Sequence, residues 1–491
     1  MKPTEFAEVK HWYHATLESL EDSKNYNNNN TSNSKSQKSS SSKLVLHHVY
    51  NTVFHGFSAR LSTRQAQQLE EQPGVVAVFP DRVYNLHTTR TPYFLGLYGD
   101  TYNTIARPLL NESNFGSNVI IGFLDAGIDP NHPSFNDDGL EPLPAAKRWK
   151  GKCAVKGFQC NNKLVGVRYL TPGKNIGHGT QTASTAAGRA LKNVFYSENG
   201  ESTAVGVAPK ARIALYKVCN VATMDICSVE LGIEPAPVVA SFSSRGPNPS
   251  SPYVMKPDVL APGVNILAAW PGDVDFKLLE FNFMSGTSMA CAHVSGLAAL
   301  LKGAHPKWSA TMIRSAIMTT AYTTANDGKP ILNNDGTKST TSDMGAGHID
   351  TNKALDPGLV YDITPQDYTV AFMCASKYTD CSARPWDLNY PAISIDLQSL
   401  LHNDITIKRT VTNVGEADAS YAVKVTNPRG VNLTINPTTM SFTSKDEKQN
   451  YSVTITATDL PKHITTVEGK IVWSDGKRRV VSPVVIVNTH N

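Results

Sequence analysis

The sequence predicts an α/β protein in three parts, with a parallel β-sheet domain in the middle of the chain and an antiparallel β-sandwich at its end. Two continuous apolar stretches, 118–124 and 213–218, are typical of parallel strands that are buried on both faces. Beyond Pro385 the pattern changes to an alternation of period two, as in 421–425 and 480–487. Such alternation indicates strands with one face in a core and the other in solvent, so we expect a separate sandwich there.

The first part of the chain predicts a small α/β unit. Residues 7–20 have the spacing of an amphipathic helix, and 63–71 is a second helix-like stretch. Strand candidates flank that second stretch at 44–49 and 75–79. A tract rich in Asn, Ser and Lys, 25–42, is expected to be a solvated loop.

The composition argues against several classes of function. The chain has 491 residues, a net charge of +4 and no block of Lys or Arg, so nothing indicates a nucleic-acid partner. No apolar run approaches the length of a membrane-spanning helix, so we expect no membrane partner. We also expect no cofactor and no metal ion. Residues 1–6 lack the apolar segment of a secretory signal.

The seven cysteines nevertheless indicate an oxidising compartment. Six of them form three pairs whose members are seven or eight residues apart, which suits short-range disulfides. The pairs are Cys153/Cys160, Cys219/Cys227 and Cys374/Cys381. Asn111, Asn432 and Asn450 begin N-glycosylation triplets, which agrees with secretion. Reduced cysteines that are close by chance remain the alternative, and a chain without its native N-terminus would reconcile the pairs with the missing signal.

Ser288 is the strongest candidate for a reactive side chain. It lies in Gly-Thr-Ser-Met-Ala-Cys-Ala-His-Val-Ser-Gly, residues 286–296, where small residues precede a helix that continues to Leu301. The first turn of a helix offers free backbone N–H groups and a field that favours negative charge. An attacking alkoxide and its tetrahedral oxyanion need both. Taken alone, the serine fits an ordinary N-cap better.

Two further motifs favour catalysis over capping. Asp125 ends an apolar strand, where a buried carboxylate needs a hydrogen-bonding partner. His178 lies between Gly177 and Gly179, which allow a substrate backbone to approach closely. Acyl transfer by a serine requires a base on the hydroxyl and an anion that orients this base. The chain therefore carries a candidate catalytic triad in the order Asp125, His178, Ser288.

These motifs resemble the subtilisin (subtilase) family, and in detail the plant subtilisin-like proteases. Further stretches carry the same resemblance across almost the whole chain: 206–209, 241–247, 256–263, 345–348, 356–362, 388–391 and 410–415. The resemblance implies a serine endopeptidase, a hydrolase that cleaves peptide bonds. In that reading Ser288 is the nucleophile, His178 is the general base and then the general acid, and Asp125 is the orienting carboxylate.

The resemblance also implies how the chain is organised and made. We expect an inhibitor-like prodomain at 1–87, a subtilisin-like catalytic domain with a parallel sheet at 88–375, and a fibronectin type III-like β-sandwich at 386–491. The stretch 88–92, Thr-Thr-Arg-Thr-Pro, resembles the start of the family's mature proteins, so we expect a zymogen that is cleaved after His87. The implied partners are protein or peptide substrates and the prodomain itself, as an intramolecular inhibitor. The implied location is extracellular, in the apoplast.

Three small departures from the family pattern affect the site. Ala126 replaces a threonine beside Asp125, Gln181 replaces a second histidine, and Ala292 replaces a proline. None of them removes a member of the triad. Cys291, in the same motif as the nucleophile, is expected to be buried and unpaired.

A fourth departure is larger. Only sixteen residues, 220–235, separate Cys219 from the Ala-Pro-Val-Val-Ala-Ser-Phe stretch that begins at Ala236. In the family this interval holds several strands and helices and also the asparagine of the oxyanion hole. We therefore expect an incomplete catalytic domain, in which the strand 213–218 lacks neighbours.

Three hypotheses follow from these observations. The first is a working, secreted serine endopeptidase. The second is a catalytically impaired or dead homologue, either a truncated isoform or a pseudoenzyme, that lacks the oxyanion-hole asparagine. The third is a structural adhesion module that uses the sandwich, which leaves the triad motifs unexplained. We expect this chain, as written, to be a poor protease or none.

Overall fold

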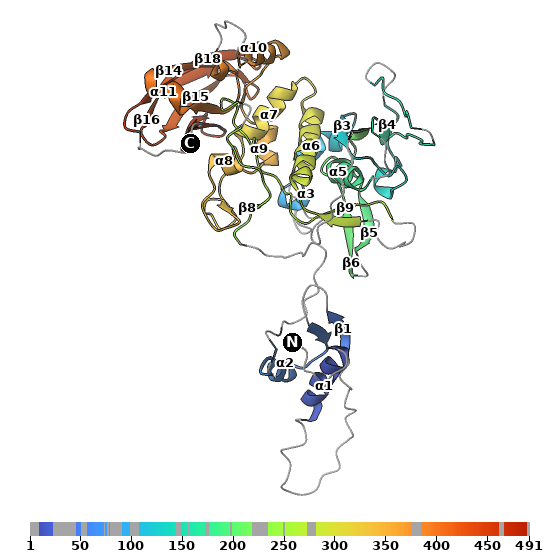
Figure 1. Cartoon of the computed structure of the whole chain (residues 1–491). Coiled ribbons are helices and arrows are strands. Elements are labelled where there is room, and N and C mark those ends of the chain that lie inside the picture. Colours follow the sequence, from blue (N-terminus) through green and yellow to red (C-terminus); the bar gives the residue numbers. More distant parts are fainter. Residues whose placement is uncertain are drawn as a thin grey trace. The chain divides into compact units, whose positions relative to one another are not determined.

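The computed structural model shows two compact units, Met1–Tyr84 and Asn85–Asn491 (Figure 1). The described residues are 9–22, 46–50, 56–72, 74–75, 78, 91–98, 108–143, 149–155, 157–171, 176–196, 199–218, 234–248, 251–272, 281–375, 384–460 and 466–488. No helix in this part of the chain is both long enough and apolar enough to cross a membrane.

The first unit contains two helices and a two-stranded antiparallel sheet. Its elements are α1 (Val9–Asp22), β1 (Leu46–Tyr50), β2 (Gly56–Ala59) and α2 (Thr63–Glu70). Both predicted helices are present, and β1 overlaps the predicted strand 44–49. Strand β2 was not predicted, and most of the predicted strand 75–79 lies outside the described residues.

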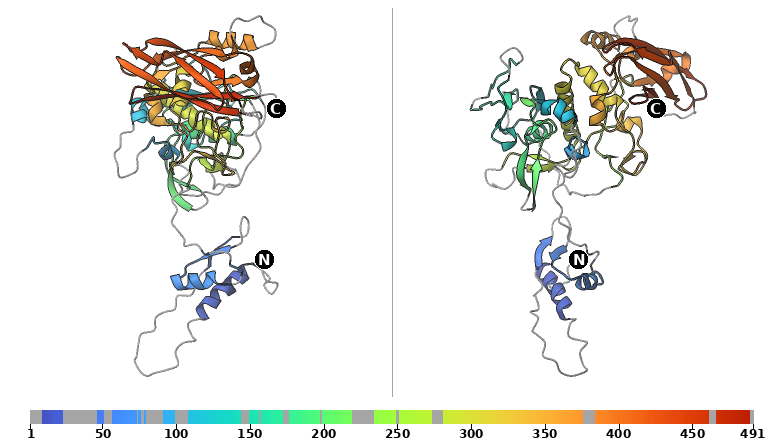
Figure 2. Two further views of the ribbon diagram at one scale, coloured as in Figure 1. Left: turned by 90° about the vertical axis from the view of Figure 1, so that its left-hand side faces the viewer. Right: turned by 180° about the vertical axis from the view of Figure 1, so that it is seen from behind.

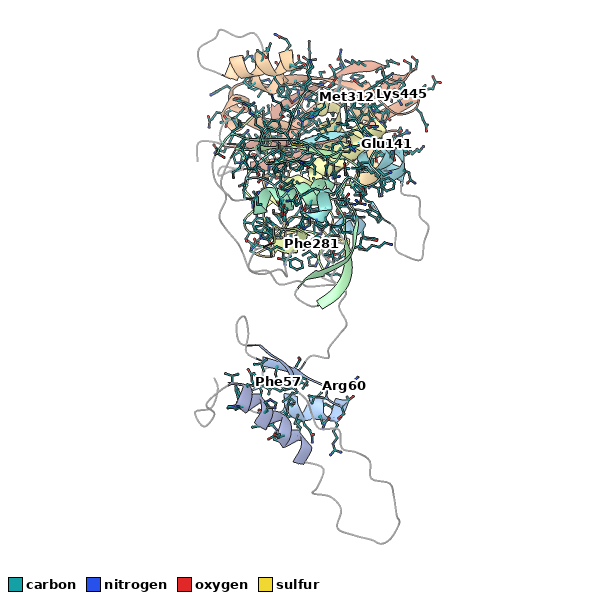
Figure 3. The ribbon with its side chains drawn as sticks, turned by 90° about the vertical axis from the view of Figure 1, so that its right-hand side faces the viewer. Phe57, Arg60, Glu141, Phe281, Met312 and Lys445 are labelled. Carbon is teal, nitrogen blue, oxygen red and sulfur yellow. A yellow bond between two sulfur atoms is a disulfide. The ribbon has the colours of Figure 1, made fainter. Side chains whose placement is uncertain are left out.

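The core of this unit follows from the amphipathic spacing of α1. Leu17 and Leu20 are buried on one face of the helix and pack with Leu69 of α2. On the same side, the ring of Tyr13 lies 4.9 Å from that of Phe57 in β2, which is labelled in Figure 3. The result is a small apolar core between the helices and the sheet.

The N-terminal part of the second unit contains a three-stranded parallel sheet in the order β3-β7-β4. The strands are β3 (Ile120–Asp125), β4 (Leu164–Tyr169) and β7 (Arg212–Lys217). The two stretches that were expected to be parallel strands, 118–124 and 213–218, are β3 and β7, so this part of the expected fold is confirmed. Ile213 and Leu215 of β7 are fully buried in the main core.

Two helices pack against this sheet and against each other. They are α5 (Gly177–Ala187) and α6 (Thr287–Ala304). A second, antiparallel pair of strands, β9 (Ile266–Ala269) and β10 (Phe281–Met284), leads into α6. Phe281, labelled in Figure 3, places its ring 5.2 Å from that of His132 and so packs β10 against the segment that follows β3.

The edge strands of this sheet are β3 and β4, and β7 lies between them. The expectation for 213–218 is therefore wrong, because β7 pairs with β4 on one side and β3 on the other. The backbone carbonyls of Val119 and Asp125 accept hydrogen bonds from the chain of β7 and its next residue. Because the backbone groups of successive residues in a strand point to opposite sides, those of residues 120, 122 and 124 point away from β7, toward the other edge of β3. Among the described residues no strand pairs with that edge, and the side chain of Leu124 is 74% exposed.

The C-terminal part is a β-sandwich, as expected (Figure 2). One sheet has the order β12-β14-β18-β16 and the other the order β13-β20-β19-β15-β17. The strands are β12 (Leu359–Val360), β13 (Ile393–Asp396), β14 (Ile405–Asn413), β15 (Ala419–Thr426), β16 (Val431–Asn436), β17 (Thr439–Phe442), β18 (Lys448–Ala457), β19 (Thr466–Ser474) and β20 (Arg479–Val487). Burial alternates strictly along β16, and Trp473 is completely buried between the sheets.

The remaining elements connect these layers. The helices are α3 (Thr91–Phe94), α4 (Pro108–Glu112), α7 (Ala310–Thr319), α8 (Thr341–Met344), α9 (Thr351–Leu355), α10 (Pro365–Ala375) and α11 (Leu397–His402). The short 3₁₀ turns are η2 (Asn114–Gly116), η3 (Pro133–Phe135) and η4 (Pro385–Asp387). The other strands are β5 (Leu191–Tyr196), β6 (Asn199–Ala204), β8 (Val238–Val239) and β11 (Leu332–Asn333).

The open edge of β3 generates a prediction about solubility. We expect Leu124→Lys to reduce self-association, because an unpaired strand edge recruits other strands and a charge on it opposes this pairing. Static light scattering of the purified protein over a range of concentrations measures the effect. Leu401→Lys is the matched control, since Leu401 is 51% exposed and the variant places the same charge on the helix α11 rather than on a strand. Equal association of the wild type and the Leu124→Lys variant would contradict the prediction.

Candidate active site

Asp125 ends β3 and is held by three hydrogen bonds. Its Oδ1 accepts from the Ala126 N–H at 2.6 Å and lies 2.7 Å from Nδ1 of His178. Its Oδ2 accepts from the Thr182 hydroxyl at 2.8 Å. A buried carboxylate is stable only when its oxygens are paired in this way.

These partners decide the charge of Asp125. Burial raises the pKa of this carboxyl, but the hydrogen bond and charge of His178, the Ala126 N–H and the Thr182 hydroxyl outweigh it. The net pKa of Asp125 lies below its ordinary value. The carboxylate is therefore charged at neutral pH and can orient and stabilise an imidazolium.

His178 is the second residue of α5, where the helix begins beside β3. The next residue must be glycine, because a Cβ at Gly179 would lie 2.1 Å from Gly127 O. This close approach brings the first turn of α5 onto the segment that follows Asp125. Since Nδ1 donates to the carboxylate, Nε2 is left as the acceptor, and it has no hydrogen-bond partner among the described residues.

Ser288 is the second residue of α6 and is half-buried. Its backbone N–H has no acceptor within the described part of the chain, as expected for the first turn of a helix. The hydrogen bonds of the described residues include none between Ser288 Oγ and the ring of His178. The structure thus joins Asp125 directly to His178, whereas Ser288 makes no direct bond to either.

Two sets of contacts place the starts of α5 and α6 at the same end of the helix pair. Gly286 N, at the start of α6, donates to Gly263 O at 2.7 Å. Three residues further on, Ile266 O accepts from Nε2 of Gln181 in the first turn of α5 at 2.8 Å. At the other end, a Cβ on Gly296 of α6 would lie 2.8 Å from Ala186 O. The helices therefore run in the same direction.

Comparisons with known proteins identify this arrangement. Residues 116–236 and 231–348 match the subtilase family, residues 1–87 match the peptidase inhibitor I9 family, and residues 387–486 match a fibronectin type-III domain. Subtilisin-like protease SBT1.5 of Arabidopsis thaliana is 32% identical over 99% of this chain and 95% of its own length. The chain belongs to the subtilase family. Subtilisin-like protease SBT1.7 of the same plant is 30% identical over 99% of this chain and 94% of its own length.

Solved structures match this chain only at low similarity. MycP1 with its N-terminal propeptide removed is 18% identical and covers 50% of this chain and 94% of its own, with a TM-score of 0.27. The serine protease of Aeromonas sobria is 12% identical and covers 77% of this chain and 87% of its own, with a TM-score of 0.30. The family assignment rests on the sequence matches. They give a subtilase domain with an I9 prodomain, as in zymogens, and a C-terminal fibronectin type III domain.

The same comparisons show how much of a relative's length has no counterpart in this chain. The alignment with SBT1.5 extends over 759 positions, although this chain has 491 residues, so at least 268 positions have no counterpart in it. The two matches to the subtilase family meet at residues 231–236. That break falls within the short interval that follows β7 in the sequence.

The small departures from the family pattern have local consequences in this subtilase. Gln181 is completely buried, and while its Nε2 donates to Ile266 O, its Oε1 has no partner. Ala126 still contributes its backbone N–H to Asp125, so the lost hydroxyl leaves the carboxylate paired. Ala292 is buried on the inner face of α6.

Thr182 is a site residue that the motif analysis missed. Its hydroxyl donates to Asp125 Oδ2 at 2.8 Å. The signal was its spacing, because residues four apart in a helix share a face and Thr182 follows His178 by four. No group of three or more metal-ligating side chains occurs in the described residues.

The structure confirms one prediction about the cysteines and corrects another. Cys153 and Cys160 form a disulfide with a Cα separation of 5.9 Å, as predicted. Cys291 is free but exposed, so the prediction that it is buried is wrong. The inward face of α6 is formed by positions 289, 292, 293 and 296, which leaves 291 on the solvent side. The side chains of the other two predicted pairs lie outside the described residues.

The hydrogen bond from Thr182 generates a pH-dependent prediction. We expect Thr182→Val to lower the free energy of unfolding by about 1.5–3 kcal/mol at pH 7, the range for a hydrogen bond to a charged group. A carboxyl with a lowered pKa stabilises the fold above its unfolded pKa of about 3.9, and this contribution is lost as the pH falls through its folded value. The loss caused by Thr182→Val should therefore shrink as the pH is lowered from 7 to 3, measured by denaturant unfolding.

Thr185→Val is the matched control for this measurement. Its hydroxyl is also buried in α5 but donates to Gln181 O at 2.9 Å, a neutral group. Its effect should be the same at both pH values. If the loss of unfolding free energy caused by Thr182→Val were also independent of pH, this would contradict the prediction that its partner, Asp125, is charged.

Proposed function

We propose that Asp125, His178 and Ser288 form an acyl-transfer triad that hydrolyses peptide bonds, and that this chain turns over slowly. The observation that carries the proposal is the 2.7 Å contact between Asp125 and Nδ1 of His178, with Ser288 at the same end of the helix pair. In the proposed reaction Ser288 Oγ attacks the peptide carbonyl and Nε2 of His178 takes its proton. The same nitrogen then protonates the leaving amine, and water releases the acyl group by the reverse route.

The charged Asp125 stabilises the imidazolium that forms in each step. The backbone N–H of Ser288 is one donor for the oxyanion, because it is free at the start of α6. The asparagine that supplies a second donor in subtilisins has no counterpart among the motifs of this chain. Loss of that donor costs about 10²–10³ in kcat, as measured for subtilisin itself.

The domain organisation belongs to the same proposal. We propose a prodomain at 1–87 that inhibits the site in the same chain, a catalytic domain at 88–375 and a fibronectin type III-like domain at 386–491. The cleavage site after His87 lies outside the described residues. The substrates are proteins or peptides, and the location is extracellular. Exposed side chains at Asn111, Asn432 and Asn450 and the Cys153–Cys160 disulfide support a secreted glycoprotein.

The second candidate function is that of a non-catalytic homologue, either a truncated isoform or a pseudoenzyme with a binding role. The observation that favours it is the open edge of β3, with Leu124 exposed where a folded sheet would cover it. Exposed apolar surface costs about 25 cal/mol per Å², and a domain has only about 5–15 kcal/mol of stability. A chain that fails to stay folded would lose activity without any change at the triad.

A fluorophosphonate probe tests the proposal, because it labels only an activated serine. We expect the purified wild-type chain to be labelled and Ser288→Ala to remain unlabelled. Peptide hydrolysis by the same preparation should depend on Ser288 and be about 100- to 1,000-fold slower than that of a full-length subtilase. Folded protein that takes up no probe would support the non-catalytic candidate. Turnover equal to that of the full-length enzyme would overturn the proposed impairment.

A further inference from the structure

A buried histidine links the helix of Ser288 to the segment that follows the expected cleavage site. His293 lies on the inner face of α6, five residues after Ser288, and is 1% exposed. Its Nδ1 lies 2.8 Å from Met289 O, and its Nε2 lies 2.8 Å from Thr91 Oγ1. Met289 directly follows Ser288, so one imidazole connects Thr91 to the turn that carries the candidate nucleophile.

The protonation of the imidazole ring decides which atom is the donor in each of these two hydrogen bonds. Burial lowers the pKa of His293 to about 4, although the carbonyls of Met289 and Pro262 favour its charged form. The ring is therefore neutral near pH 7. Because the Met289 carbonyl can only accept, Nδ1 carries the proton and Nε2 accepts from the hydroxyl of Thr91. Thr91 is thus the donor that holds the imidazole.

Thr91 is itself fixed to the catalytic part. It begins α3, and its carbonyl accepts from Leu95 N at 2.9 Å. Leu95 and Leu97 are buried in the main core. Thr91 is the fourth residue after His87, so the expected cleavage site lies within about 14 Å of it along the chain.

The first turn of α6 needs such a restraint. Gly286 O accepts two backbone hydrogen bonds there, one of 3.2 Å from Met289 N, at the upper limit of the usual range, and a longer one of 3.5 Å from Ala290 N. Typical N–H to O distances are about 2.7–3.2 Å, so this turn is weakly held by its own backbone. The side chain of His293 adds a bond of 2.8 Å to the same turn.

We infer that Thr91 and His293 are positioning residues for Ser288. The Thr91 hydroxyl orients the imidazole, and the imidazole holds the turn on which Ser288 is presented. Neither residue touches the reacting atoms, and the effect is transmitted through Met289 O. The beginning of the expected mature chain is then part of the support of the site. This inference rests on the proposed role of Ser288 as the nucleophile.

Thr91→Val tests the inference, with Thr91→Ser as its matched control. Valine keeps the shape of threonine but removes the donor, whereas serine keeps the donor. We expect hydrogen exchange in the peptide 286–296 to become about tenfold faster in Thr91→Val and to stay at the wild-type rate in Thr91→Ser. Exchange in β14, on the sandwich, should be unchanged in both. Unchanged exchange in 286–296 for Thr91→Val would overturn the inference, whether or not the chain is an enzyme.

Labelling of Ser288 by the fluorophosphonate separates positioning from simple destabilisation. For Thr91→Val we expect every folded molecule to be labelled, but about tenfold more slowly, and Thr91→Ser should restore the wild-type rate. A smaller labelled fraction at an unchanged rate would show a merely structural role and would overturn the inference. If the wild type takes up no probe, the proposed function fails, and the exchange measurement alone decides the inference.

Discussion

The close packing of α5 against α6 is the constraint on which the candidate site depends. Ten of the eleven residues of α5 are buried, and most are Gly, Ala, Ser or Thr. These small side chains allow neighbouring elements to approach the backbone of the helix closely. On α6, a Cβ at Gly296 would lie 2.5 Å from Cβ of Val207 and 2.8 Å from Ala186 O. Only glycine allows this approach. Because the helices run side by side in the same direction, their first turns, with His178 and Ser288, lie at the same end of the pair.

The second requirement is that Asp125 stays in place although its strand is an edge. The contacts that position it come from the chain that follows β7, from α5 and from the neighbouring Ala126. Val218 N of the β7 chain donates to its carbonyl, and α5 supplies His178 and Thr182 to its carboxylate. The open groups of residues 120, 122 and 124 face the other way. The contact between Asp125 and His178 is therefore present although β3 is an edge strand, and Leu124 of the same strand is exposed.

The sequence predicted what is encoded locally and failed where the answer depends on distant partners. The motifs around Asp125, His178 and Ser288 and the period-two pattern of the sandwich led to the correct family and fold. The order of parallel strands follows from crossover connections rather than from any one strand, so β7 was mistaken for the edge. Cys291 and Thr182 could have been placed from helical spacing alone. The link from Thr91 to His293 spans about 200 residues and leaves no local pattern.

In a subtilase, one set of residues serves proton transfer and another stabilises the negative charge of the oxyanion. We propose that this chain has the first set and lacks one donor of the second. The contacts that serve proton transfer, between Asp125, His178 and Thr182, lie within β3 and α5. Oxyanion stabilisation needs donors aimed at a charge that exists only in the transition state. Acylation and deacylation both pass through such an oxyanion, so one missing donor slows both steps while the proton relay stays intact. An assembled pair of Asp125 and His178 is for this reason compatible with the slow turnover that we propose, in which the donors around the oxyanion, rather than Asp125 and His178, would set the rate.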